Sequence, residues 1–169
     1  MKISQLKNAP QWLLNAKVKN EDVEIIDGIV IWKGGTWIDG IWKFGSWKNG
    51  LWKDGVWKDG VWKDGTWENG SWRNGLWNNG TWKSGTWQIG RWKNGIWENG
   101  IWENGYWENG IWKNGTWIDG NYGGKWVDGY WIQGLWENET WINGHWENGV
   151  WKYGKWENGH CPGFDMGKW

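Results

Sequence analysis

Residues 46–60 read SWKNGLWKDGVWKDG, three consecutive copies of a five-residue unit with Trp in second place and Gly in fifth. Working outward, the unit continues without a break in either position from Ile31 to Gly120, eighteen copies in all. Seven more copies run from Lys125 to Gly159, and only Glu139 stands where a Gly is due. Self-similarity at a fixed period indicates a repeat architecture, so the repeat decides the fold.

The composition and charge exclude several classes of protein. Collagen is excluded because the 30 Gly recur every fifth rather than every third residue. Basic and acidic side chains balance at 19 each, so no net charge attracts nucleic acid or an anionic membrane. The balance is uneven, however: residues 36–95 carry nine basic and five acidic side chains, and residues 96–159 carry four and nine. We expect these opposite halves to favour end-to-end self-association of the molecule.

The glycines predict a coiled backbone. Most units close with Asn-Gly or Asp-Gly, pairs that favour turns with positive φ. About three extended residues remain between turns, which is too short for ordinary hairpins and too rich in Gly for a helix. A chain that extends, turns and repeats must coil, and stacked coils can pair their strands and satisfy the backbone groups.

The tryptophans are predicted to fill the inside of this coil. Alternation along a strand places the Gly before each unit and the Trp two residues later on the same side. The other places hold mostly Lys, Glu, Asn, Asp and Thr, which belong in water. Twenty-five exposed indoles would cause aggregation, so we expect them inside, with Gly making room beside each ring.

These units resemble the pentapeptide repeat family, which has a small residue two places before a central Leu or Phe. Gly35-Thr36-Trp37 and Gly100-Ile101-Trp102 are similar to that motif with Ala replaced by Gly and Leu by Trp. Gly-x-Trp arrays of this kind also resemble those of uncharacterised phage and bacterial proteins. The resemblance covers about three quarters of the chain in period and implies an all-β fold, a right-handed quadrilateral β-helix (β-solenoid) with about four units per coil.

First-place residues provide a second argument for four units per coil. At a step of 20 they sort into similar columns, Ser46, Thr66, Thr86 and Tyr106 with hydroxyls, and Ile41, Val61, Thr81 and Ile101 with β-branches. Like-with-like stacking is expected of coils in register. Six and a half coils at about 4.8 Å each predict a shaft about 31 Å long.

Both ends differ from the array and are predicted to cap it. Residues 1–30 form the N-terminal cap, with a short helix after Pro10 and strands on either side of a turn at Asp27-Gly28. Residues 31–159 form the solenoid, and residues 160–169, with Cys161, form a C-terminal cap. Repeat arrays need such atypical ends because raw strand edges invite pairing.

The phase of the repeat slips once, at residues 121–124, where Tyr122 stands in place of Trp in a four-residue unit. We interpret this unit as a deletion tolerated as a bulge or tight corner. The alternative is a notch for a ligand or partner, formed by Tyr122, Gly123 and Gly124 together with Glu139.

Catalytic chemistry is not indicated. The only histidines are His145 and His160, and neither a His160–Cys161 nucleophile pair nor a metal site with Cys161 has the expected geometry or spacing. Gly-rich phosphate binding would need a strand-loop-helix context. We therefore expect no catalytic residues, no cofactor and no metal.

Three function classes remain. We expect a non-enzymatic structural or protein-interaction module, a rigid rod with a protein partner in a phage or bacterial assembly. The first alternative is a carbohydrate-binding module that uses exposed Trp. The second is a DNA-mimic protein acting on gyrase, which resembles pentapeptide repeat proteins with a strongly acidic surface. Direct nucleic-acid binding is disfavoured by the neutral charge. The N-terminus lacks the apolar core of a signal peptide and nothing approaches a membrane span, so we expect a cytoplasmic or virion-associated protein.

Overall fold

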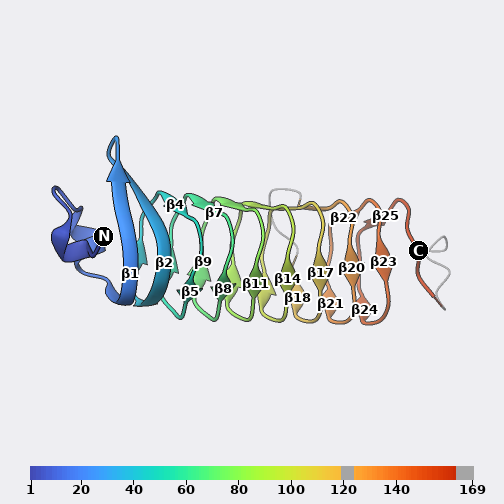
Figure 1. Ribbon diagram of the computed structural model, residues 1–169. Helices are drawn as coiled ribbons and strands as arrows, with labels where there is room; N and C mark the ends of the chain where they lie inside the picture. Colours follow the sequence, from blue (N-terminus) through green and yellow to red (C-terminus); the bar gives the residue numbers. More distant parts are fainter. Residues whose placement is uncertain (119–123, 163–169) are drawn as a thin grey trace.

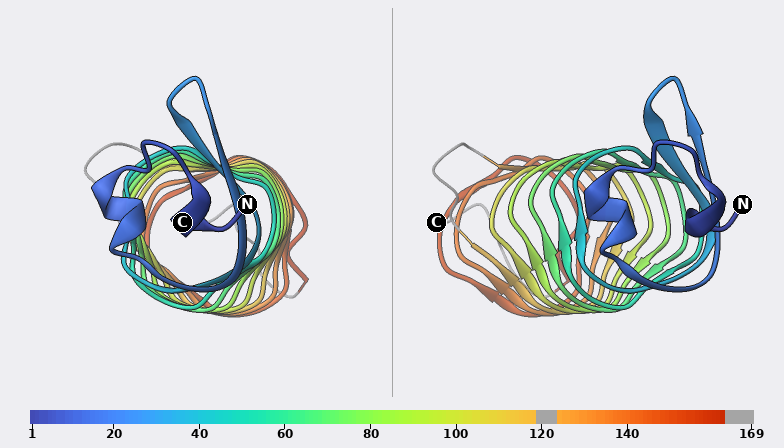
Figure 2. Two further views of the ribbon diagram at one scale, coloured as in Figure 1. Left: turned by 60° about the vertical axis from the view of Figure 1, so that its left-hand side comes forward. Right: turned by 90° about the vertical axis from the view of Figure 1, so that its left-hand side faces the viewer.

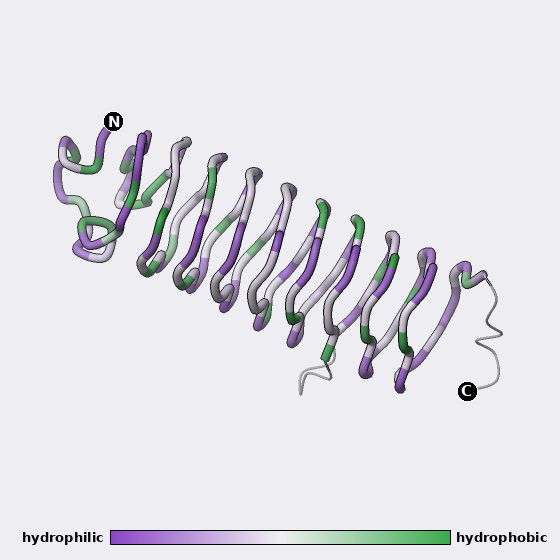
Figure 3. Tube along the Cα trace, turned by 90° about the horizontal axis from the view of Figure 1, so that it is seen from below, coloured by the Kyte–Doolittle hydropathy of each residue, from purple (hydrophilic) through white to green (hydrophobic). Residues whose placement is uncertain are grey.

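The computed structural model is a parallel β-solenoid whose first and last described strands, β1 (Lys17–Ile26) and β25 (Lys155–Trp156), lie toward opposite ends (Figure 1). It describes residues 1–118 and 124–162. Viewed close to its long axis, the chain winds in nearly superimposed rings around one central core (Figure 2). Hydrophilic residues recur in every coil along the length of the shaft (Figure 3). The expected all-β solenoid is confirmed.

The N-terminal end begins with two short helical turns. These are the 3-10 helix η1 (Ile3–Gln5) and the α-helix α1 (Gln11–Leu14), which starts directly after Pro10 as expected. Leu13 is fully buried, and the Trp12 ring meets the edge of Trp42 at 5.2 Å between centroids. The helix therefore covers the first coil with apolar side chains.

A hairpin completes this end of the solenoid. Strand β1 (Lys17–Ile26) pairs antiparallel with β2 (Ile29–Asp39). The turn at Asp27 and Gly28 has positive φ at both residues, 50° and 77°, as the Asp-Gly pair predicts. Strand β2 continues into the array, where its two parts pair parallel with β4 (Ser46–Trp47) and β5 (Leu51–Trp52).

The remaining strands are two residues long and lie on three faces of the shaft. The first face holds β4 (Ser46–Trp47), β7 (Val61–Trp62), β10 (Leu76–Trp77), β13 (Arg91–Trp92), β16 (Tyr106–Trp107), β19 (Lys125–Trp126), β22 (Thr140–Trp141) and β25 (Lys155–Trp156). The second holds β5 (Leu51–Trp52), β8 (Thr66–Trp67), β11 (Thr81–Trp82), β14 (Ile96–Trp97), β17 (Ile111–Trp112), β20 (Tyr130–Trp131) and β23 (His145–Trp146). The third holds β3 (Ile41–Trp42), β6 (Val56–Trp57), β9 (Ser71–Trp72), β12 (Thr86–Trp87), β15 (Ile101–Trp102), β18 (Thr116–Trp117), β21 (Leu135–Trp136) and β24 (Val150–Trp151).

Each coil contains three units, so the expectation of four units per coil was wrong. Trp87 is paired with Trp72 and Trp102, fifteen residues away on each side. The third face has eight strands, one per coil, which span about 34 Å at 4.8 Å per step. The physical reason is the size of the indole: three rings meeting edge to face close the interior, whereas a fourth would leave an empty centre.

The core consists of three columns of stacked indoles. Within a column, neighbouring rings are nearly parallel, with centroids between 4.6 and 5.1 Å apart. Between columns, successive rings meet edge to face at 5.6–6.1 Å. All tryptophans of the array are buried except Trp151 and Trp156 in the last coil, which are partly exposed. The prediction that the indoles lie inside is confirmed.

Backbone hydrogen bonds join each coil to the next. In a typical unit, Thr86 N–H donates to Gly70 O at 3.0 Å and Gln88 N–H donates to Trp72 O at 2.8 Å. The indole N–H groups contribute much less, because most of the buried ones have no acceptor within the described ranges. Among the described residues, the indole N–H groups of Trp126 and Trp131 donate to the carbonyl oxygens of Asn143 and Asn148, each at 3.1 Å. Ring contacts and the backbone ladder therefore hold the shaft together.

The irregular unit is an addition to a coil, not a deletion from one. Trp107 pairs with Trp126 and Trp117 pairs with Trp136, offsets of nineteen residues where the rest of the array has fifteen. The four extra residues thus follow a complete set of three units. Ring stacking continues across the slip, with 4.8 Å between the Trp107 and Trp126 centroids. The interpretation as a deletion was wrong because the core requires three indoles in every coil.

Candidate interaction surface

The surface of the shaft is made of columns in which one side chain per coil stands above its counterpart. Each strand turns its Trp inward, so the first- and third-place side chains of every unit point outward, while the fourth-place side chains lie at the corners. Neighbours in a column are one coil, about 4.8 Å, apart. Such columns can form ion pairs with each other or present a repeated pattern to a partner.

The second face carries alternating charges. The third-place residues of five successive coils are Lys53, Glu68, Lys83, Glu98 and Lys113. The Lys83 Nζ lies 3.5 Å from a Glu68 oxygen, and the Lys113 Nζ lies 3.3 Å from a Glu98 oxygen. This face neutralises its own charge along the column.

The first face has other internal partners. Glu24 of the hairpin pairs with Lys33 at 2.5 Å and reaches Lys48 at 4.0 Å. Farther along, Arg91 pairs with Glu108, and Lys155 pairs with Glu157 at 2.8 Å. Cap and shaft are thus joined by charge as well as by strand pairing.

The third face separates its charges along the shaft. Lys43, Lys58 and Arg73 follow one another in three successive coils, and Glu103 comes two coils later. Within the described residues, none of these four side chains has an ion-pair partner. Only Glu137 and Lys152, near the far end, pair with each other at 3.0 Å. This face therefore has a basic part and an acidic part.

Exposed apolar side chains also concentrate on the third face and on the corner that follows it. They come from the first and the fourth place of the units, and they are Ile41, Phe44, Ile89, Ile101, Val150 and Tyr153. Scattered exposed apolar residues are ordinary on a soluble protein. Their grouping beside separated charges makes this face the best candidate for a contact surface.

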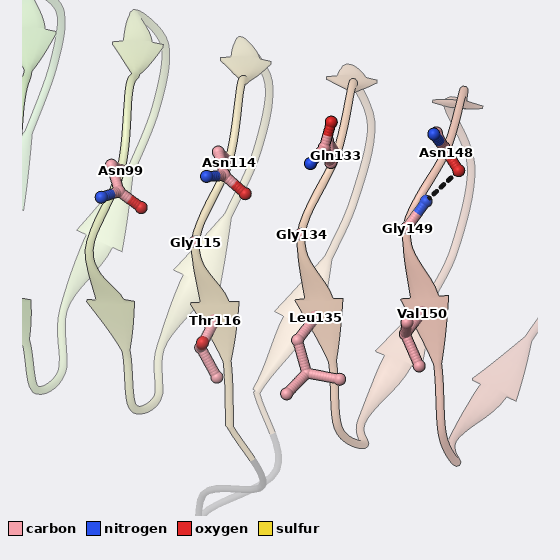
Figure 4. Close-up of a pocket in the computed structure, with 10 residues that line it drawn as sticks. All are labelled: Asn99, Asn114, Gly115, Thr116, Gln133, Gly134, Leu135, Asn148, Gly149 and Val150. Carbon is pink, nitrogen blue, oxygen red and sulfur yellow. Dashed lines mark hydrogen bonds between the residues drawn. The ribbon is translucent and has the colours of Figure 1, made fainter.

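An open groove runs along the corner between the second and third faces (Figure 4). One wall is a column of amides from four successive coils, Asn99, Asn114, Gln133 and Asn148, and the other contains Thr116, Leu135 and Val150. The Asn148 side chain accepts a hydrogen bond from the Gly149 N–H at 2.8 Å, which fixes the corner. The groove offers amide donors and acceptors at every coil and no charge.

A second groove contains a column of stacked rings that the sequence analysis missed. Tyr130 and His145 are 4.4 Å apart between centroids, and His145 and His160 are 4.9 Å apart. Asp128 and Asn143 lie beside them on the opposite wall. The signal in the sequence was the fifteen-residue spacing of the two histidines, which places them in adjacent coils.

These histidines do not form a metal site in the described part of the chain. No group of three or more His, Cys, Asp or Glu side chains that could hold a metal ion occurs among those residues. The Tyr130 and His145 rings stack at an interplanar angle of 20°, whereas the His145 and His160 rings are tilted by 36°. Cys161 is half-buried.

The residues suggested as a notch are only partly described. Tyr122 and Gly123 lie outside the described residues. Gly124 is buried, and the Glu139 carboxyl carbon lies 3.6 Å from the position that a Gly124 Cβ would occupy. The Asn104 Oδ1 lies 3.2 Å from the same position, and Asn104 is 7% exposed. Gly124 therefore packs closely with both Glu139 and Asn104.

Glu139 adopts a backbone conformation otherwise found at glycines in the array, with φ of 103°. Its carbonyl still accepts the Lys155 N–H at 2.9 Å, so the ladder continues past it. A side chain at this φ is strained. The strain coincides with the slip in the repeat, which sets this corner apart from the rest of the shaft.

Two pKa shifts belong to the N-terminal cap. The amino terminus donates to Asp22 at 2.5 Å, and this hydrogen bond lowers the pKa of the Asp22 carboxyl. A hydrogen bond to Glu24 raises the pKa of Lys33. Both groups are exposed, so these shifts describe the fastening of the cap and not a catalytic site.

Comparison with protein-family models, with curated proteins and with solved structures gave no match. Among the described residues, no helix is long and apolar enough to cross a membrane.

Proposed function

We propose that this protein is a non-enzymatic rigid rod that presents columns of side chains to a protein partner within a larger assembly. The observation that supports this most is the difference between the inward and the outward places of the repeat. The tryptophans of the regular coils form an internal indole core, while the outward places vary from coil to coil. Because the outward side chains vary while the core stays constant, each face of the shaft presents a different binding surface.

The likeness to the pentapeptide repeat family belongs to this proposal at the level of the five-residue spacing. The coil of three units differs from the four expected of that family. A phage or bacterial assembly and a cytoplasmic or virion-associated location remain parts of the proposal that follow from the resemblance.

The two alternative functions receive less support from the geometry. A carbohydrate-binding module was expected to use exposed Trp, but the array tryptophans are buried except for the partly exposed Trp151 and Trp156. A DNA mimic needs a continuous acidic stripe. On the second face the acids alternate with Lys53, Lys83 and Lys113, and in the described coils of the other faces they are separated by neutral or basic residues.

The test is site-specific photocrosslinking of the full chain in the cells that produce it. A photoreactive residue replaces Ile101 on the third face, Lys113 on the second or Lys93 on the first. We expect one protein to be captured from one face and to bind the purified rod with the same face preference. Retention of the rod by a glycan array or by duplex DNA, without a protein partner, would refute the proposal.

A further inference from the structure

We define the third face as the outward side chains of strands β3 to β24 in the eight-stranded sheet together with the described residues among the two that follow each strand. It is neutralised only in part within the molecule, because Glu137 and Lys152 pair at its far end. Its third-place column reads Lys43, Lys58, Arg73, Gln88, Glu103, Ile118, Glu137 and Lys152. Three successive cations about 4.8 Å apart repel one another. A complementary surface should therefore place acids opposite this basic part.

A second copy of the chain offers that surface. We propose that two molecules pack side by side through their third faces, antiparallel, with a two-fold axis across the shaft at Gln88. This operation keeps each place of the unit opposite the same place of the partner and reverses the order of the coils. Because both copies have the same pitch, every coil from the first to the seventh meets a partner coil in register.

Two of the three cations face acids under this operation, and the third, Lys58, faces Ile118. Arg73 lies one coil before Gln88 and Glu103 lies one coil after it, so each Arg73 faces a Glu103 of the other copy. Lys43 and Glu137 lie three coils before and after Gln88, so Lys43 faces the ion pair that Glu137 forms with Lys152 of the other copy. The symmetry produces every such pair twice, giving a self-complementary surface.

The uncharged residues fit the same arrangement. In the first-place column, Thr86 lies at the axis. Ile41 and Leu135 lie three coils before and after it, so Ile41 faces Leu135 of the other copy. Ile89, at the corner of the axial coil, is 39% exposed and meets its own counterpart. Of the exposed apolar groups of this face, Ile41, Phe44, Ile89 and Ile101 lie within the contact, whereas Val150 and Tyr153 of the eighth coil lie outside it.

The contact area predicts a weak dimer. Seven matched coils span about 29 Å, and a width of about 10 Å gives roughly 300 Å² of projected area per molecule, well below the about 800 Å² of a stable complex. Association that depends on exposed ion pairs should therefore weaken as salt rises.

End-to-end association, expected from the sequence, is less favoured at the N-terminal end. The outermost strand, β1, carries Lys17, Lys19, Glu21, Asp22 and Glu24. Charged edge strands resist pairing with another chain.

The proposed side-by-side dimer rests on the proposed function, because it also treats the faces as protein-contact surfaces. It identifies the partner of the third face as a second copy of the chain. Sedimentation velocity of the full chain should show a monomer–dimer equilibrium at low salt that shifts to monomer between about 20 mM and about 500 mM NaCl. Arg73→Glu or Glu103→Arg should weaken the dimer about tenfold, because each change places like charges opposite each other twice. The double substitution should restore it.

The control variants are Lys93→Glu on the first face and Glu147→Arg on the second, which make the same changes in net charge elsewhere. They should leave the dimer constant within about twofold, and circular dichroism should show all variants folded. The inference would be overturned by a protein that stays monomeric at low salt. It would also be overturned if the double variant dimerised no more tightly than the single variants, or if the control variants dimerised as weakly as Arg73→Glu. A heterologous partner captured in the crosslinking experiment would still support the proposed function.

Discussion

A glycine in fifth place is required twice over, by backbone conformation and by space. At Gly85, φ is 118°, a region that side chains with a Cβ rarely adopt. An added Cβ would also fall far inside van der Waals contact with Gly70 O of the previous coil. Since that oxygen accepts the ladder hydrogen bond from Thr86, it cannot move away without loss of pairing.

We therefore expect Gly85→Ala to lower the free energy of unfolding by about 3 kcal/mol or more, as strain and clash add. Gly34→Ala is the matched control, because no atom lies within 4 Å of its added Cβ and its φ is not positive. That variant should change stability by less than about 0.5 kcal/mol. Chemical denaturation of both variants measures the difference, and equal effects would contradict the account.

Trp87 shows what one indole contributes. It stacks at 4.7 Å on Trp72 and on Trp102, and it meets Trp82 and Trp92 edge to face at 6.0 Å. Trp87→Ala should cost about 3–5 kcal/mol, as for a large core aromatic. Trp151→Ala, in the partly exposed last coil, should cost clearly less. A loss below about 1 kcal/mol at Trp87 would mean that its neighbours do not depend on it.

At the scale of an element, the two-residue strands depend on their columns. The alternating column on the second face predicts that Lys83→Glu, which places three acids in successive coils, destabilises the protein by about 1 kcal/mol at low salt. High salt should remove most of the difference because the residues are exposed. Lys93→Glu, on the first face, is the control with the same change in charge. Thermal melts at two salt concentrations test this, and a salt-independent loss would point to packing instead.

The hairpin cap should be sensitive to acid. Since the pKa of Asp22 is lowered in the folded state, its contribution is fully present above the unfolded pKa and is lost as pH falls through the folded one. We expect the Val23 amide, which donates to Met1 O at 2.9 Å, to lose hydrogen-exchange protection below about pH 4. Asp22→Asn should remove this pH dependence, whereas Asp27→Asn, in the turn, should keep it. Identical pH profiles for both variants would disprove the assignment.

Coil size is where sequence reasoning failed, and the reason lies in which residues were compared. First-place side chains such as Ser46 and Thr66 point to solvent, so their likeness at a step of 20 is not imposed by packing. The core is identical in every unit and therefore carries no register information. The informative residues were the third-place charges Glu68 and Lys83, whose alternation at a step of fifteen matches the observed pairing. The inward Trp and the glycine corners were predictable because burial and backbone sterics leave no alternative.

For the whole molecule, the buried core predicts its fluorescence. Emission should be blue-shifted and mostly resistant to acrylamide, because the described tryptophans with partial exposure are Trp12, Trp151 and Trp156. Replacing these three with Phe should reduce the quenchable fraction, and unfolding in guanidinium should make all emission accessible. Strong quenching of the folded triple variant would contradict an indole core.

The candidate surface was harder to foresee than the core. The notch at residues 121–124 was suggested from a break in the period, and its described members, Gly124 and Glu139, do lie together. The stacked Tyr130, His145 and His160 and the charge separation on the third face become visible only when the coil length is known. The coil length determines which residues share a surface column, so an error in the predicted coil length misplaces every column.

A coil of three units also constrains how such a gene can grow or shrink. Gain or loss of one unit would rotate everything downstream by a third of a turn, moving Glu103 and Glu137 off the side occupied by Arg73. Only duplications of fifteen residues would lengthen the shaft while leaving each side chain above its former neighbour. Homologues that keep the same contact surface should therefore differ in length by multiples of fifteen, apart from short additions at the corners.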